Sequence, residues 1–200
     1  MEVSPKSGIM VVQKMGFTLN EKLQEVGMNK NLSTSNLIGG IGALLLFLSC
    51  LFFLNLTAAG IISLVGEIFL LYSLNKMSKI FYDNQIFRYA LIWFYMIIIR
   101  TIFILVAGKN SSSYIMVFDL LVTVGVYYVK NAFSLLSLYT KVPQYRIGGL
   151  LYFVGMILML LGEGGKLLTF SYIGLLVISV AWAIIAFAFF RTPNEVKNKA

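Results

Sequence analysis

The sequence predicts an all-helical, polytopic membrane protein: a bundle of about six transmembrane spans in three hairpins, with the N- and C-termini in the cytoplasm. Composition is the first observation, because 59% of the 200 residues are hydrophobic and only 12% are charged. A soluble domain is nearer half apolar and a quarter charged. The second observation is that the apolar residues form runs of about 20, the length that crosses a bilayer. The third is that the basic residues flank these runs.

The chain divides into a polar N-terminal tail over residues 1–36, a transmembrane domain over 37–190 and a charged tail over 191–200. No cleavable signal peptide is recognisable before the first apolar run, so we expect that run to be an uncleaved anchor. Met28, just before it, is an alternative start of translation. The expected spans cover, in chain order, residues 37–54, 58–74, 86–107, 114–129, 147–161 and 171–190.

Short polar segments separate the spans. Asn55 and Thr57 interrupt the first two apolar runs. A single helix of roughly 38 residues is the alternative there, but it would not fit across a bilayer of about 30 Å. Gly108 to Ser113 forms a turn-like loop between the third and fourth spans. Past Lys130, the pattern of the fourth span continues as an amphipathic stretch that we expect to lie in the membrane interface, until Pro143 ends it.

Orientation follows from the lysines and arginines. With the N-terminus inside, thirteen of the sixteen basic residues fall on the cytoplasmic side, only Lys109 and Lys166 fall outside, and Arg100 lies within a span. This positive-inside bias places both termini in the cytoplasm of a multi-pass plasma-membrane protein. The formal charge of +8 is spread along the chain, so it does not indicate nucleic-acid binding. Three inner basic residues are candidates for contacts with anionic lipid headgroups: Lys130, Lys141 and Arg146.

Three charged residues lie inside predicted spans. Arg100 is about 10 Å below the outer boundary and Asp119 about 8 Å, at one residue per 1.5 Å of helix. Because a short loop joins their two spans, we expect these side chains to form an ion pair. Glu67, in the second span, lies about 14 Å deep and could join them.

Two interpretations of these charges stay open. An ionisable residue inside a span is a candidate functional group. Glu67 stands out because no basic residue lies near it in the sequence, so its carboxyl could carry a proton or bind a cation. The alternative is that Glu67, Arg100 and Asp119 form one satisfied network that fixes the register of the helices.

Other residue types restrict the chemistry. The chain has no histidine, the commonest acid–base catalyst and metal ligand, and its single cysteine, Cys50, lies in an apolar run. Gly162 to Lys166 is expected to be the loop between the last two spans; it lacks the spacing of a phosphate-binding loop. The sequence therefore predicts no enzyme, with no catalytic residue, no metal site and no cofactor.

Several short motifs occur in a recognisable order along the chain: Leu37–Gly42, Gly60–Gly66, Leu74–Ser78, Phe81–Asp83, Ala132–Phe133, Arg146–Leu150 and Ala181–Phe189. Their order resembles a prokaryotic, largely archaeal, membrane-protein family known as domain of unknown function 996. The resemblance extends over about Asn31 to Arg191. It implies a membrane protein without an assigned activity, so it transfers no catalytic or binding residue.

These observations lead to two functional hypotheses. The first is a non-enzymatic structural or accessory membrane component that contacts membrane lipids and either a second copy of itself or a membrane partner subunit. The second is a small transporter or ion or proton conductor that uses Glu67 together with the Arg100–Asp119 pair. Flux measurements with and without the Glu67 carboxyl discriminate between them.

Overall fold

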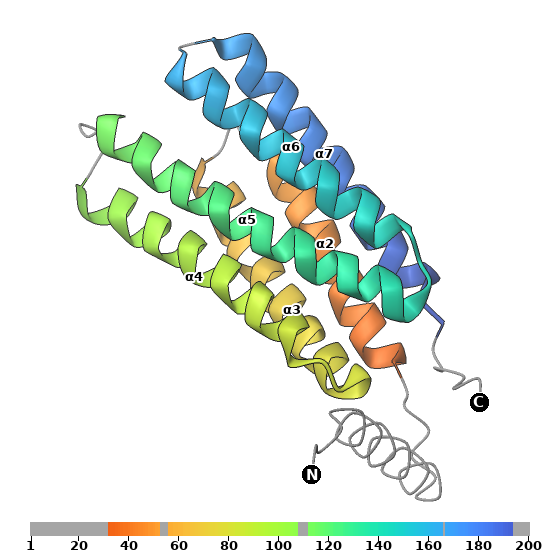
Figure 1. Cartoon of the computed structure of the whole chain (residues 1–200). Coiled ribbons are helices and arrows are strands. Elements are labelled where there is room, and N and C mark those ends of the chain that lie inside the picture. The colour runs from red at the N-terminus through yellow and green to blue at the C-terminus, as the bar shows by residue number, and fades with distance from the viewer. Residues whose placement is uncertain (1–31, 53–55, 108–111, 166, 194–200) are drawn as a thin grey trace, which may run out of the picture. The chain divides into compact units, whose positions relative to one another are not determined.

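The computed structural model describes residues 32–52, 56–107, 112–165 and 167–193, and all regular structure in these ranges is helical. The helices each have the length and composition needed to cross a membrane, in agreement with the predicted fold class. The cytoplasmic location of the termini stays a prediction, and the two tails lie largely outside the described residues. In chain order the helices are α2 (Ser33–Leu51), α3 (Leu56–Phe81), α4 (Asn84–Ala107), α5 (Ser112–Thr140), α6 (Gln144–Gly164) and α7 (Leu168–Arg191) (Figure 1).

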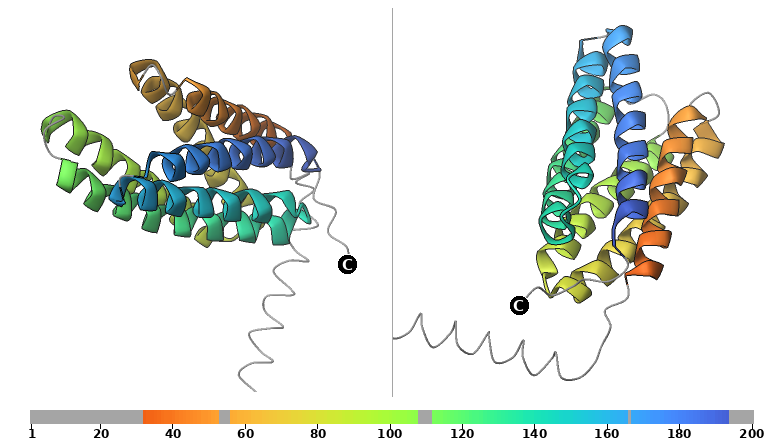
Figure 2. Two further views of the ribbon diagram at one scale, coloured as in Figure 1. Left: turned by 90° about the horizontal axis from the view of Figure 1, so that it is seen from above. Right: turned by 90° about the vertical axis from the view of Figure 1, so that its right-hand side faces the viewer.

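The helices of residues 32–193 pack in a closed cycle. Going round it, α3 packs on α2, α2 on α7, α7 on α6, α6 on α5, α5 on α4, and α4 on α3 again. The α3–α4 contact is the least extensive. We call the end where α2 begins and α7 ends the terminal end, and the opposite end the distal end. In Figure 1, the α4–α5 pair diverges from the α6–α7 pair toward the distal end, and the views in Figure 2 agree.

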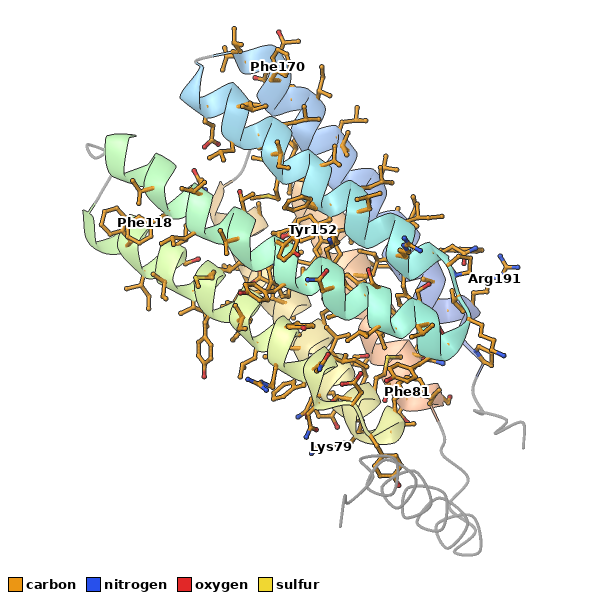
Figure 3. All side chains as sticks on the ribbon, viewed as in Figure 1. Lys79, Phe81, Phe118, Tyr152, Phe170 and Arg191 are labelled. Carbon is orange, nitrogen blue, oxygen red and sulfur yellow. The ribbon has the colours of Figure 1, made fainter. Side chains whose placement is uncertain are left out.

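An aromatic core fills the bundle toward the terminal end. The Trp182 ring on α7 lies 4.7 Å from that of Tyr152 on α6 and 6.1 Å from that of Trp93 on α4, measured between centroids. Such large buried rings contribute much of the apolar area that stabilises a bundle. Figure 3 shows Tyr152 between the helices. The aromatic core comprises six buried side chains: Trp93, Phe133, Tyr145, Tyr152, Trp182 and Phe189.

Burial is concentrated in the terminal half. On α2, no described residue after Leu46 is buried, and on α4 none after Trp93 up to Phe103. Polar contacts close the terminal end: the Asn36 side-chain amide donates to the backbone oxygen of Thr192 at 3.0 Å, and the hydroxyls of Thr192 and Tyr145 lie 2.9 Å apart. The terminal half is therefore closely packed and the distal half is more open.

Glycines bring neighbouring helix backbones together at two places. A Cβ atom on Gly42 of α2 would lie 2.8 Å from the carbonyl oxygen of Gly66 of α3, and the reverse distance is also 2.8 Å. Gly155 of α6 and Gly174 of α7 form a similar close approach. Small residues are typical of such contacts between helices in membranes.

Three helices continue past the ends of the predicted spans. α3 continues past Leu74 to Phe81, and α5 continues past Val129 as one helix to Thr140, with Phe133 and Leu136 fully buried. One face of the amphipathic stretch therefore packs in the bundle core, whereas Leu138 is 71% exposed, and its location in the membrane interface stays a prediction. Gly162 to Gly164, predicted to be loop, forms the last turn of α6. The predicted breaks at Asn55 and around Gly108 lie outside the described residues.

Candidate functional site

Glu67 lies near the middle of α3, about 17 Å from the helix start, and its residue is only 5% exposed. The Ser63 hydroxyl, one turn earlier on the same helix, donates a hydrogen bond of 2.9 Å to its carboxyl oxygen Oε1. Among the described residues, Glu67 forms no salt bridge. The Glu67 carboxyl therefore accepts a hydrogen bond from a neutral hydroxyl and has no basic partner among the described residues.

The structure brings Arg100 of α4 and Asp119 of α5 together. The Arg100 Nε atom donates to Oδ1 of Asp119 in a short ion-paired hydrogen bond. The two partners differ in exposure: the Asp119 side chain is 7% exposed and that of Arg100 35%. Arg100 thus brings a positive charge to a carboxylate that is buried between helices.

Glu163 is a third charged residue beside this pair. It lies in the last turn of α6 and is exposed, and its carboxyl lies within electrostatic range of Asp119 and Arg100. The second carboxyl oxygen of Asp119, Oδ2, is buried and has no hydrogen-bond partner among the described residues. Three helices, α4, α5 and α6, therefore contribute one charged side chain each to this acidic cluster, which we define as Arg100, Asp119 and Glu163.

Sequence reasoning missed Glu163 because the glycines around it resemble a loop. A signal was nevertheless present, since extending the fifth span by one turn places Glu163 at the distal boundary, near the depth of Asp119. Gly162 belongs to a close helix contact, because its position leaves no room for a side chain beside Ser171 of α7. The glycines here serve packing as well as the turn.

Tyr152 links the acidic cluster to the aromatic core. Its phenol oxygen accepts a hydrogen bond of 3.3 Å from the Trp93 indole nitrogen. The same phenol lies within electrostatic range of Glu67 and Arg100. Glu67 on α3 and Arg100 on α4 thus both act electrostatically on this buried tyrosine, although no hydrogen bond or ion pair joins Glu67 to Arg100 or Asp119 among the described residues.

The three predicted headgroup contacts differ in position. Lys141 and Arg146 are exposed at the terminal end of α5 and α6. The Lys130 ammonium lies 4.4 Å from the centroid of the Tyr127 ring and 5.8 Å from that of Phe153. Lys130 is ten residues, or about 15 Å, from the end of α5, and this cation–π contact gives its ammonium a partner within the described bundle.

The described residues contain no group of three or more acidic, cysteine or histidine side chains placed to hold a metal ion. Glu67 and the acidic cluster together comprise three carboxyls and one arginine; Glu67 and Asp119 are buried, and Glu163 is exposed.

The chain is similar to an uncharacterized protein of Methanocaldococcus jannaschii. The two sequences are 29% identical over 187 residues, which cover 84% of this chain and 97% of that protein. No family model matches the chain, and no solved structure matches it. The similarity extends over nearly the whole relative, but it assigns no role to any residue.

Proposed function

We propose that this chain is a non-enzymatic multi-pass membrane protein that carries protons or small cations, with Glu67 as the central binding group. Glu67 is the observation on which this depends: a carboxyl in mid-span, nearly fully buried, with a serine hydroxyl as its described hydrogen-bond partner. A charged side chain at the centre of a transmembrane helix costs about 2.5–3.5 kcal/mol on insertion scales. The carboxylate therefore needs a counter-charge, and a proton or a cation would supply one.

A purely structural role explains Glu67 less well than it explains the ion pair. Charges that fix helix register inside a membrane are paired with one another or with backbone groups. Arg100 and Asp119 have this arrangement and join α4 to α5. Glu67 has no such basic partner among the described residues. The transport hypothesis is therefore favoured for Glu67, and the structural hypothesis for the pair.

The remaining assignments belong to the same proposal. The distribution of basic residues supports a plasma-membrane protein with cytoplasmic termini. The motif order supports membership of the domain of unknown function 996 family, and the similarity to the Methanocaldococcus jannaschii protein is compatible with it. Membrane lipids are the expected partners, together with a second copy of the chain or a partner subunit.

Flux through proteoliposomes tests the role of Glu67. The purified full-length chain is reconstituted, and the movement of protons, sodium and potassium is followed with entrapped indicators. We expect flux of one of these ions with the natural protein and a loss of at least about tenfold, or about 1.4 kcal/mol of transition-state stabilisation, in Glu67→Gln.

Asp83→Asn provides the matched control, because it makes the same acid-to-amide change in the short connection between α3 and α4. It should leave the flux unchanged. Flux that is equal in Glu67→Gln and the natural protein would refute the proposal. An absence of flux for all ions, with a fixed partner subunit co-purifying, would support the accessory role instead.

A further inference from the structure

We propose that Asp119 and Glu163 form a second acid site, in which the two carboxyls bind and share one proton beside Arg100. The ligand is a proton. The site is separate from Glu67, and the inference does not depend on whether the protein transports ions.

The hydrogen bonding of Asp119 indicates that this site needs one more hydrogen-bond donor. One of its carboxyl oxygens accepts from Arg100, while the other is buried without a hydrogen-bond partner among the described residues. An ionised carboxylate can only accept hydrogen bonds, so this second oxygen needs a donor. A buried acceptor left without one costs about 1–3 kcal/mol. The Glu163 carboxyl lies within interaction range of Asp119, and when it is protonated its O–H group can donate to this oxygen.

Charge balance leads to the same conclusion. Two carboxylates in contact repel each other, and such pairs retain a single proton. Arg100 compensates one negative charge. With both carboxyls ionised the acidic cluster has a net charge of −1, and with one proton it is neutral. Neutrality is favoured at Asp119, whose side chain is only 7% exposed, because an uncompensated buried charge is costly.

The charged groups that act on Glu163 come from two neighbouring helices. Asp119 on α5 and Arg100 on α4 are the charged side chains that act on it among the described residues. On α7, Ser171 packs against the neighbouring Gly162 and is neutral. Lys109 and Lys166 lie in connections outside the described residues. Within the described bundle, one cation therefore faces two acids.

A metal ion fits this arrangement less well than a proton. Calcium takes six to eight oxygen ligands, and magnesium requires a nearly ideal octahedron. The acidic cluster provides two carboxyls, one of which already binds an arginine. A proton needs only one donor oxygen and one acceptor oxygen.

Proton binding also has a mechanical consequence. On uptake, one Glu163 oxygen forms an O–H bond, the proton comes from solvent, and that O–H donates to the free oxygen of Asp119 without any other covalent change. The hydrogen bond joins the distal end of α6 to α5, where the α4–α5 pair diverges from α6–α7 (Figure 1). Loss of the proton replaces this bond by repulsion between two carboxylates.

Infrared difference spectroscopy of the full-length chain in lipid nanodiscs tests the proposal. Spectra are recorded over a pH series in sodium- and calcium-free buffer, and the carbonyl stretch of protonated carboxylic acids is monitored. We expect the natural protein to show a band that Glu163→Gln and Asp119→Asn each remove or shift. Glu67→Gln, the matched control, should leave that band in place.

A second variant, Glu163→Asp, keeps the proposal testable if Glu163→Gln fails to fold. Glu163→Asp keeps the carboxyl but shortens the side chain, so it should keep a protonated band at a shifted frequency. Direct counting of protons released on alkalinisation should give one fewer per chain for Glu163→Gln than for Glu163→Asp. The proposal is overturned if Glu163→Gln and the natural protein have the same spectrum, or if calcium at fixed pH abolishes the band.

Discussion

Replacing Arg100 by leucine tests whether its ion pair with Asp119 stabilises the folded bundle. The change has two opposing effects. Insertion of α4 becomes easier by about 3 kcal/mol, because an arginine at a span centre is replaced by an apolar residue. The folded state loses the cation that compensates Asp119, whose side chain is 7% exposed. Only the second effect lowers the free energy of unfolding of the assembled bundle.

The magnitude follows from the burial of the two partners. Breaking a buried ion pair by removing one partner costs about 3–5 kcal/mol. We take the lower end, about 3 kcal/mol, because the Arg100 side chain is 35% exposed. Replacing both partners by apolar residues is often neutral, so Arg100→Leu with Asp119→Leu should cost about 1 kcal/mol or less. The double variant should therefore be about 2 kcal/mol more stable than Arg100→Leu alone, or about 30-fold in the ratio of folded to unfolded protein.

Equilibrium unfolding in mixed micelles, with increasing denaturing detergent, measures these differences for both single variants and the double variant. Arg100→Lys is the matched control, since it keeps the positive charge, and it should be more stable than Arg100→Leu. The reasoning would be refuted if the double variant lost stability equal to the sum of the two single losses. It would also be refuted if Arg100→Leu alone were as stable as the natural protein.

Two further substitutions test packing and a polar contact at the terminal end. Gly66→Ala should destabilise the bundle by about 1–3 kcal/mol, because its Cβ would meet the carbonyl oxygen of Gly42 at 2.8 Å; thermal unfolding in detergent measures this. Gly60→Ala on the same helix is the control, with nothing within 4 Å of the added carbon, and should not be destabilised. Tyr139→Phe removes the hydrogen bond that the tyrosine hydroxyl donates to Asp83 at 2.9 Å, and should cost about 0.5–1 kcal/mol in the same assay. Equal stability of Gly66→Ala and Gly60→Ala, or of Tyr139→Phe and the natural protein, would contradict these contacts.

The helical spans could be predicted because each is marked by a local run of apolar residues in the sequence. A run of about 20 apolar residues identifies a span without any knowledge of its neighbours. The end of α5 could not be found this way, because Lys130 resembles a boundary. In the structure its ammonium lies over the Tyr127 ring and its helix continues to Thr140. A lysine can remain within a helix when its charged end finds such a partner.

The candidate site was predictable only for two residues whose depths along their helices are counted from the same loop. Arg100 and Asp119 precede and follow one short connection, so their depths in the membrane are directly comparable. Glu67 is measured from a different connection, and depth alone does not reveal which side of α3 it occupies. Its separation from the ion pair, and its common approach to Tyr152, depend on helix rotation and packing. Those quantities come from tertiary contacts that a single sequence does not encode locally.

The aromatic core also restricts how an ion bound at Glu67 could cross the bundle. Trp93 is about 10 Å farther toward the terminal end than Arg100 on the same helix, and its ring contacts Tyr152 and Trp182. The six buried rings make the core of the terminal half largely apolar, which is unfavourable for a passing ion. An ion that leaves Glu67 toward the terminal side would have to pass these rings, so we expect its passage to need helix movement. The α3–α4 contact, the least extensive in the cycle, is the place where such movement disrupts the least packing. If Glu67 carries an ion, this arrangement favours a carrier that alternates between two states over an open channel.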